Sequence, residues 1–83
     1  MLEKKVTITH SKDHEFELAT MIVHMASRYN SRLAISMKNH KVNAKSIMGM
    51  MTLGLMEGDE VVVSAEGEDE VEALEALVKL LNQ

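Results

Sequence analysis

The sequence has no cysteine, no proline and no tryptophan, and its only aromatic residues are Phe16 and Tyr29. The absence of cysteine excludes a disulfide framework, a thiolate nucleophile and a cysteine-ligated zinc or iron–sulfur site. The absence of proline means that no loop is stiffened by a fixed φ angle. The first ten residues lack the apolar run of a signal peptide, and no window approaches the roughly 20 apolar residues that span a bilayer. We therefore expect a cytoplasmic protein without a membrane partner.

The chain is short but apolar enough to fold. Its 83 residues predict a single domain over 1–83 and exclude a two-domain enzyme. Residues 1–56 hold eight Lys/Arg and four Asp/Glu, a balance of +4, whereas residues 57–83 hold nine acids and one lysine, a balance of −8. The acidic third is typical of a solvated helix face. Without a basic stripe, and with two aromatic residues, we expect no direct binding to nucleic acid.

Alternating and β-branched residues predict four strands. Apolar alternation favours strands over 4–9 and 32–37. The second of these is followed by turn residues and a short apolar step at Val42, which together predict a β-hairpin. A run of valines favours a fourth strand over 60–65.

Apolar residues at helical spacing predict three helices, over 16–29, over 47–53 and at the C-terminal end. Ser46 and Gly54 stand where the N-cap and C-cap of the second helix belong. Residues 69–72 resemble a capping box for the third helix. The order βαββαβα predicts an α+β fold, a two-layer open-faced sandwich with a four-stranded antiparallel sheet and three helices on one face. The expected apolar stripe of the last helix is Val71, Leu74, Leu77, Val78 and Leu81.

Few motifs carry chemistry on their own. Residues 49–54 have the glycine spacing of a phosphate-binding loop but lack the lysine and hydroxyl residue that it requires, so we discard this match. His10 and His14 have the spacing of two metal ligands on a helix, but they flank a predicted loop and no third ligand is in view. We interpret them as loop histidines and expect His24 and His40 to face solvent. We expect no metal, no cofactor and no Ser-His-Asp arrangement.

Four segments together suggest a family. They are Ala-Thr at 19–20, Ala-Ser-Arg-Tyr at 26–29, Val-Asn-Ala-Lys-Ser-Ile-Met-Gly at 42–49 and Gly-Glu-Asp-Glu-Val-Glu-Ala-Leu at 67–74. The chain resembles, over almost its whole length, the HPr family of phosphocarrier proteins of the bacterial phosphotransferase system, and most closely its Gram-positive HPr/Crh-like branch. This resemblance implies a protein that carries or displays phosphate and is not an enzyme. The family's βαββαβα sandwich agrees with the order predicted above.

The resemblance also implies a histidine at the start of the first helix, which accepts phosphate from Enzyme I and passes it to Enzyme IIA. Counted back from the Ser46 segment without a gap, Glu15 replaces this histidine, Glu17 replaces the family's arginine and Leu18 replaces its proline. Together with Asp13, the two glutamates repel an incoming phosphate dianion. We therefore predict that the ordinary carrier reaction is lost.

Other interpretations of this altered site stay open. Acids in the first turn stabilise a helix by roughly 0.3 to 1 kcal/mol each through its dipole, which is the simpler interpretation of Glu17. Glu15 alternatively holds a fixed negative charge that resembles a phosphohistidine. His14 is a rival phosphate acceptor, which we disfavour because a displacement of one residue spoils the in-line geometry of phosphoryl transfer.

Ser46 is the preferred phosphate acceptor. The resemblance implies that HPr kinase/phosphorylase phosphorylates this serine from ATP and that the product binds catabolite control protein A. A phosphate at a helix N-terminus gains backbone N–H bonds, so the switch is a change of surface charge. Without the resemblance, Ser46 reads as a plain N-cap and the nearby methionines as a core stripe. The expected partner-binding residues are Phe16, Lys45, Ile47, Met48 and Met51.

We therefore expect a regulatory phosphoprotein of carbon catabolite regulation that acts through Ser46. The alternatives are a divergent phosphocarrier between Enzyme I and Enzyme IIA, and a relic that binds neither partner. Because Glu17 replaces an arginine that takes part in docking, partner recognition in this chain differs from that of the family. Crh-type relatives exchange the N-terminal strand between protomers, and the polar run 10–13 would provide the hinge, so a homodimer is also open.

Overall fold

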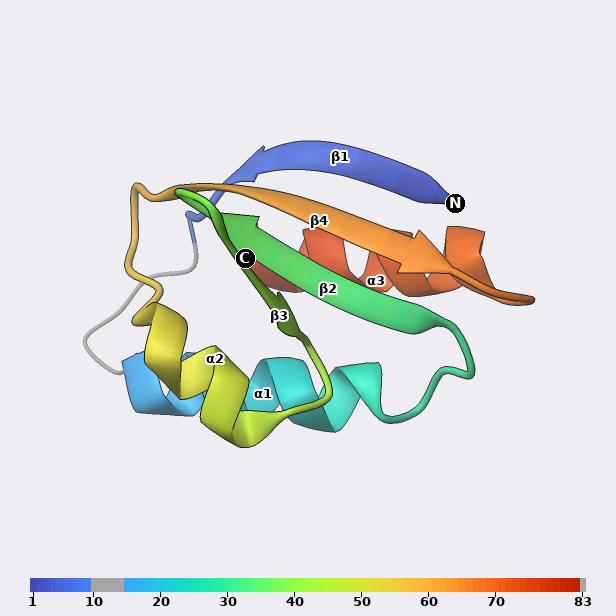
Figure 1. The fold of residues 1–83 in the computed structure, drawn as a ribbon, viewed down its shortest axis with the longest axis horizontal. Coiled ribbons are helices and arrows are strands. Elements are labelled where there is room, and N and C mark those ends of the chain that lie inside the picture. Colours follow the sequence, from blue (N-terminus) through green and yellow to red (C-terminus); the bar gives the residue numbers. More distant parts are fainter. Residues whose placement is uncertain (10–14, 83) are drawn as a thin grey trace.

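The structure is a computed structural model that describes residues 1–9 and 15–82. Within these residues, strands and helices follow one another in the predicted order βαββαβα (Figure 1). The elements are β1 (Leu2–Thr7), α1 (Glu15–Ala26), β2 (Arg32–Met37), β3 (His40–Asn43), α2 (Ile47–Leu53), β4 (Glu60–Glu66) and α3 (Glu70–Leu81).

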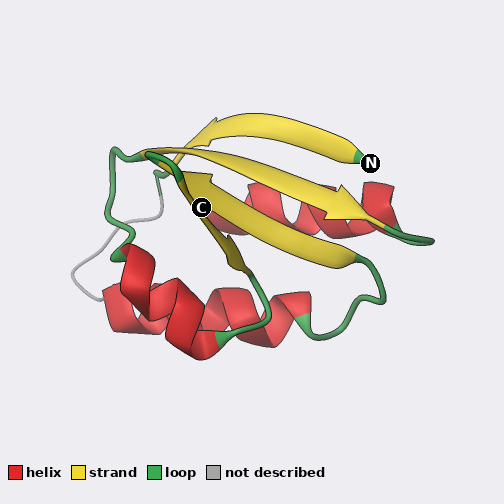
Figure 2. Ribbon diagram, viewed as in Figure 1, coloured by secondary structure: helices red, strands yellow, loops and turns green. Residues whose placement is uncertain are grey.

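The strands form one antiparallel sheet in the order β1-β4-β2-β3. The last strand in the sequence, β4, therefore lies between β1 and β2, with Lys4 opposite Val63 and Ile35 opposite Val63 on the other side. The helices cover one face of this sheet, and the two layers are distinguished by colour in Figure 2. The predicted α+β two-layer sandwich is confirmed.

The core lies between the sheet and the helices, and it follows the predicted periodicity. In β1 and the residue after it, Val6 and Ile8 are buried whereas Lys5 and Thr7 are exposed, as strand alternation requires. Fully buried side chains from the sheet meet those of the helices in one cluster. The largest apolar side chains that are less than 2% exposed are Ile8, Ile22, Leu33, Ile35, Met50, Leu77, Leu81, Val61 and Val63.

Two elements end earlier than predicted. The first strand ends at Thr7 instead of residue 9, because the N–H of Thr9 leaves the sheet and donates to the carbonyl of Leu81 at 2.9 Å. The first helix ends at Ala26 instead of residue 29. The N–H groups of Arg28 and Tyr29 bond three residues back instead of four, which tightens the chain into a turn.

Two predictions about α3 are wrong. Val71 is not part of the apolar stripe, because it is 55% exposed. The buried positions are centred on Leu77, and Val71 lies about 120° away from it around the helix, outside the buried face. Asp69 does not form a capping box, since its side chain makes no capping hydrogen bond to α3. The buried side chains of α3 are Ala73, Leu74, Leu77, Leu80 and Leu81.

Candidate functional site

Ser46 is the N-cap of α2, as predicted. Its backbone is extended, with φ −105° and ψ 115°, and its Oγ accepts a hydrogen bond from the N–H of Gly49 at 3.1 Å. The carbonyl of Ser46 accepts the N–H of Met50 at 3.0 Å, which starts the helix. A Cβ on residue 49 would lie 3.2 Å from Cβ of Val42, which is a tight contact, and 3.5 Å from the Ser46 hydroxyl, which is an ordinary one, so glycine avoids crowding against Val42. Ser46 is only partly buried.

A tight turn connects β3 to Ser46. The Oδ1 of Asn43 accepts the N–H of Lys45 at 2.8 Å, and the Asn43 carbonyl accepts the N–H of Ser46 at 3.0 Å. The Lys45 ammonium group donates to the carbonyl of Tyr29 at 2.7 Å. Lys45 is half-buried, and its hydrogen bond connects this turn to the chain that follows α1. The turn fixes the position of the Ser46 hydroxyl before any partner binds.

The outer face of α2 is apolar and exposed. Met48 is 75% exposed, Met51 is 49% exposed and Ile47 is 37% exposed. The opposite face of the same helix holds Met50 and Leu53, which are buried in the core. The methionines of α2 are thus divided between core and surface. We call the three exposed residues Ile47, Met48 and Met51 the docking patch.

The start of the first helix is placed only in part. Helix α1 begins at Glu15, the residue predicted to stand in place of the family's histidine. The predicted roles of Glu15, Phe16 and Glu17 depend on side chains that lie outside the described part of the structure. His14 lies outside the described residues altogether. The predictions for these four residues therefore stay predictions.

Histidines and acids form no metal site in the described residues. His24 and His40 are exposed, as predicted. The predicted loop histidines His10 and His14 lie outside the described residues. Among residues 1–9 and 15–82, no three histidine, aspartate or glutamate side chains gather in a way that would hold a metal ion. No helix in this part of the chain has the length and apolarity needed to cross a bilayer.

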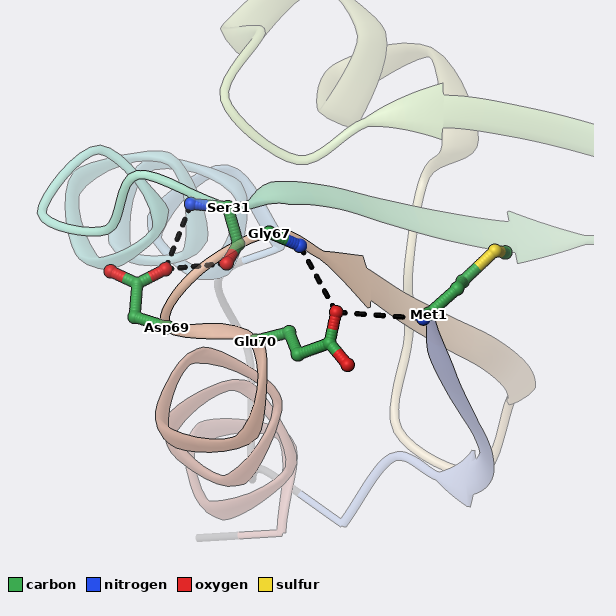
Figure 3. Close-up of polar contacts among 5 residues, drawn as sticks. All are labelled: Met1, Ser31, Gly67, Asp69 and Glu70. Atoms are coloured by element: carbon green, nitrogen blue, oxygen red, sulfur yellow. Dashed lines mark hydrogen bonds and ion pairs between the residues drawn. The ribbon is translucent and has the colours of Figure 1, made fainter.

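A polar cluster that the sequence did not predict joins the chain after α1 to the start of α3 (Figure 3). One carboxylate oxygen of Asp69 accepts the N–H of Ser31 at 2.9 Å and also the Ser31 hydroxyl. The other oxygen accepts the N–H of Asn30 at 2.9 Å. Hydrogen bonds hold the pKa of Asp69 below its ordinary value of 3.8. The bond from the Ser31 hydroxyl makes the largest contribution, and the bond from the Asn30 N–H makes the next largest. The cluster positions α1 against α3.

Glu70 organises the same turn from its other side. Its Oε1 accepts the N–H of Gly67 at 3.0 Å and lies 3.5 Å from the Met1 amino group (Figure 3). The residue pair that closes this turn is thus Gly67 and Glu70, two positions before the predicted capping box of 69–72. In the sequence, this contact is indicated only by the spacing of an acidic residue three positions after a glycine.

Comparisons with known proteins agree with this geometry. The family described as PTS HPr component phosphorylation site matches residues 2–83. The HPr-like protein Crh of Bacillus subtilis is 39% identical over 83 residues, which cover 100% of this chain and 98% of that protein. A crystal structure of HPr from Thermoanaerobacter tengcongensis matches with a TM-score of 0.90 at 43% identity, over 98% of this chain and 91% of that chain. A crystal structure of B. subtilis Crh, described as a dimer with a swapping domain, matches with a TM-score of 0.75 at 39% identity, over 98% of this chain and 93% of that chain.

Proposed function

This chain belongs to the HPr family of the bacterial phosphotransferase system, and we propose that it is a cytoplasmic regulatory phosphoprotein that displays phosphate on Ser46. It is an HPr-like protein and not an enzyme. One observation carries the proposal: a partly accessible serine hydroxyl caps α2 directly beside an exposed apolar patch. We take residues 1–83 as one domain that serves this role.

The surroundings of Ser46 suit a phosphate. In the proposed reaction, a bond forms from the Ser46 oxygen to the γ-phosphorus of ATP, the bond from this phosphorus to the bridging oxygen breaks and ADP leaves, and the hydroxyl proton passes to a base of the kinase. The new group carries a charge of about −2 and three acceptor oxygens. Residues 18–56 contain five Lys/Arg and no Asp or Glu, so this phosphate would be the first negative group in the segment. The N–H of Gly49, which already points at the hydroxyl, would then donate to a charged acceptor.

The docking patch supplies the apolar part of the proposed recognition. Met48 and Met51 lie one helical turn apart on the same exposed face, immediately after the phosphate acceptor. A partner that contacts both the phosphate and the docking patch recognises a charge and an apolar surface together. The flexible thioethers adapt to the shape of that partner. We propose HPr kinase/phosphorylase as the enzyme that phosphorylates Ser46, and catabolite control protein A as the partner that binds the phosphorylated protein.

The proposal includes the loss of the carrier reaction. Residue 15, at the first position of α1, is a glutamate, and a carboxylate is not a stable relay for a phosphoryl group at the potential of a histidine. The competing proposal is a divergent phosphocarrier between Enzyme I and Enzyme IIA. It is favoured by the 43% identity to the T. tengcongensis HPr and would use His14 as its acceptor.

The experiment that tests the proposed function is a binding titration. Purified catabolite control protein A is titrated with the full chain before and after treatment with HPr kinase and ATP. We expect the phosphorylated chain to bind at least about tenfold more tightly, since a charge-assisted contact contributes roughly 1.5 to 3 kcal/mol. Ser46→Ala treated in the same way should show no gain. Equal binding before and after phosphorylation would contradict the proposal.

We also propose a homodimer formed by exchange of β1, as the swapping domain in the B. subtilis Crh structure suggests. In this chain β1 is an edge strand that pairs with β4 alone, so its exchange would leave the rest of the sheet intact. Light scattering after size-exclusion chromatography should show two species. A single monomeric species over a wide range of concentrations would contradict the exchange.

A further inference from the structure

The exposed apolar surface of the described residues consists mainly of thioethers. Of the seven large apolar side chains that are exposed, five are methionine and two are not. The buried core of the same residues contains a single methionine, Met50, among leucine, isoleucine, valine and alanine. Methionine is thus placed where an oxidant reaches it. The exposed large apolar residues are Met1, Met21, Ile47, Met48, Met51, Met56 and Val71.

We propose that the docking patch is a redox-sensitive surface, in which oxidation of Met48 and Met51 by a peroxide prevents partner docking at Ser46. This inference rests on the proposed function. Met48 is 75% exposed and Met51 is 49% exposed, whereas Met50, between them in sequence, is 1% exposed. Helix α2 therefore holds reactive and protected sulfurs within four consecutive residues.

The chemistry is a two-electron oxygen transfer. The thioether sulfur attacks one peroxide oxygen, the O–O bond breaks, an S–O bond forms, and hydrogen peroxide is reduced to water. The product, methionine sulfoxide, is polar and is reduced back by methionine sulfoxide reductases. A sulfoxide oxygen that finds no hydrogen-bond partner in an apolar interface makes burial of the side chain unfavourable. Oxidation would therefore remove the apolar half of the recognition and leave the phosphate in place.

The fold should survive the modification. The sulfurs of Met48 and Met51 belong to exposed side chains, and the packing of α2 onto the core depends on Met50 and Leu53. The bond between the Ser46 hydroxyl and the Gly49 N–H involves neither sulfur. Phosphorylation and oxidation are thus two separate inputs to one docking surface, the first promoting binding and the second preventing it.

The test uses the full chain phosphorylated on Ser46 and treated with hydrogen peroxide. Peptide mass spectrometry should find one added oxygen on Met48 and on Met51 while Met50 stays unmodified. Affinity for catabolite control protein A should fall about tenfold or more, because two polar oxygens replace apolar contacts. Methionine sulfoxide reductase should restore it, and the far-UV circular dichroism spectrum should not change.

Two variants with the same number of substitutions provide the control. The double variant Met48→Leu with Met51→Leu should keep its affinity after peroxide treatment. The double variant Met21→Leu with Met56→Leu, which removes methionines that are 38% and 60% exposed outside the patch, should lose affinity as the unmodified chain does. Binding that survives oxidation of Met48 and Met51 overturns this inference alone. Failure of the reduced phosphoprotein to bind the regulator overturns the proposed function, and this inference with it.

Discussion

Gly67 approaches Ser31 so closely that a Cβ on Gly67 would lie 2.7 Å from the Cα and 2.7 Å from the Oγ of Ser31. Gly67 also has φ +150°, a conformation that side chains rarely adopt. The two residues belong to the turn before α3 and to the chain just before β2. A glycine at 67 thus allows Ser31 to reach the Asp69 carboxylate.

Gly67→Ala should lower the free energy of unfolding by about 1 to 3 kcal/mol, because the new methyl group meets the backbone of Ser31. Each kcal/mol corresponds to about 4 to 8 °C in melting temperature for a domain of this size. Gly58→Ala is the control: Gly58 has φ +95°, but nothing lies within 4 Å of its Cβ position. Urea unfolding should show a larger loss for Gly67→Ala, and equal losses would contradict the close contact.

Asp69 should make stability depend on pH. Its hydrogen bonds lower its pKa in the folded state below the ordinary value of 3.8, so the unfolded state binds its proton first as pH falls. The stabilisation is complete above the ordinary pKa and is lost as pH falls through the lowered pKa. Asp69→Asn should therefore be less stable than the unmodified chain at pH 6, and the difference should close in acid. Thermal melts from pH 2 to 7 test this, and a difference that is constant with pH would contradict it.

Ser46→Ala should destabilise the chain by about 1 kcal/mol even without any phosphate, because the N–H of Gly49 loses its acceptor. Ser46→Asn keeps a side-chain oxygen at the cap and should retain most of the stability. The measurement is urea unfolding of the unphosphorylated proteins. Equal stability of Ser46→Ala and the unmodified chain would show that the cap bond contributes nothing.

Enzyme I and phosphoenolpyruvate should leave no acid-labile phosphohistidine on this chain, since residue 15, at the start of α1, is a glutamate. The double variant Glu15→His with Glu17→Arg restores an acceptor and a cation, and it should gain phosphohistidine. Intact mass spectrometry at neutral pH gives the readout. Phosphate on the unmodified chain that disappears in His14→Ala would establish the divergent carrier instead.

The local patterns of the sequence were sufficient to predict the order of the elements and the two-layer α+β class, but not the order of the strands in the sheet. Val6 and Ile8 alternate with polar residues, and Ser46 and Gly54 bound a seven-residue helix, so each signal lies within a few positions of the element that it specifies. The helix cap at Ser46, the central residue of the candidate site, could be predicted for the same reason. The prediction that Ser46 is phosphorylated came only from the family resemblance.

Contacts between distant residues could not be predicted in this way. Asp69 pairs with Ser31, 38 positions away, and the local pattern at 69–72 suggested a helix cap instead. The Lys45 ammonium group, which was expected to bind a partner, donates to the carbonyl of Tyr29, 16 positions away. These partners are brought together only when the helices pack on the sheet.

We expect this chain to receive phosphate on Ser46 and not on a histidine. The most direct measurement is intact mass and phosphosite mapping after parallel incubation with HPr kinase plus ATP and with Enzyme I plus phosphoenolpyruvate. We predict one phosphate, on Ser46, in the first reaction and none in the second. An unmodified Ser46 after the kinase reaction, or a phosphohistidine after the Enzyme I reaction, would contradict the account.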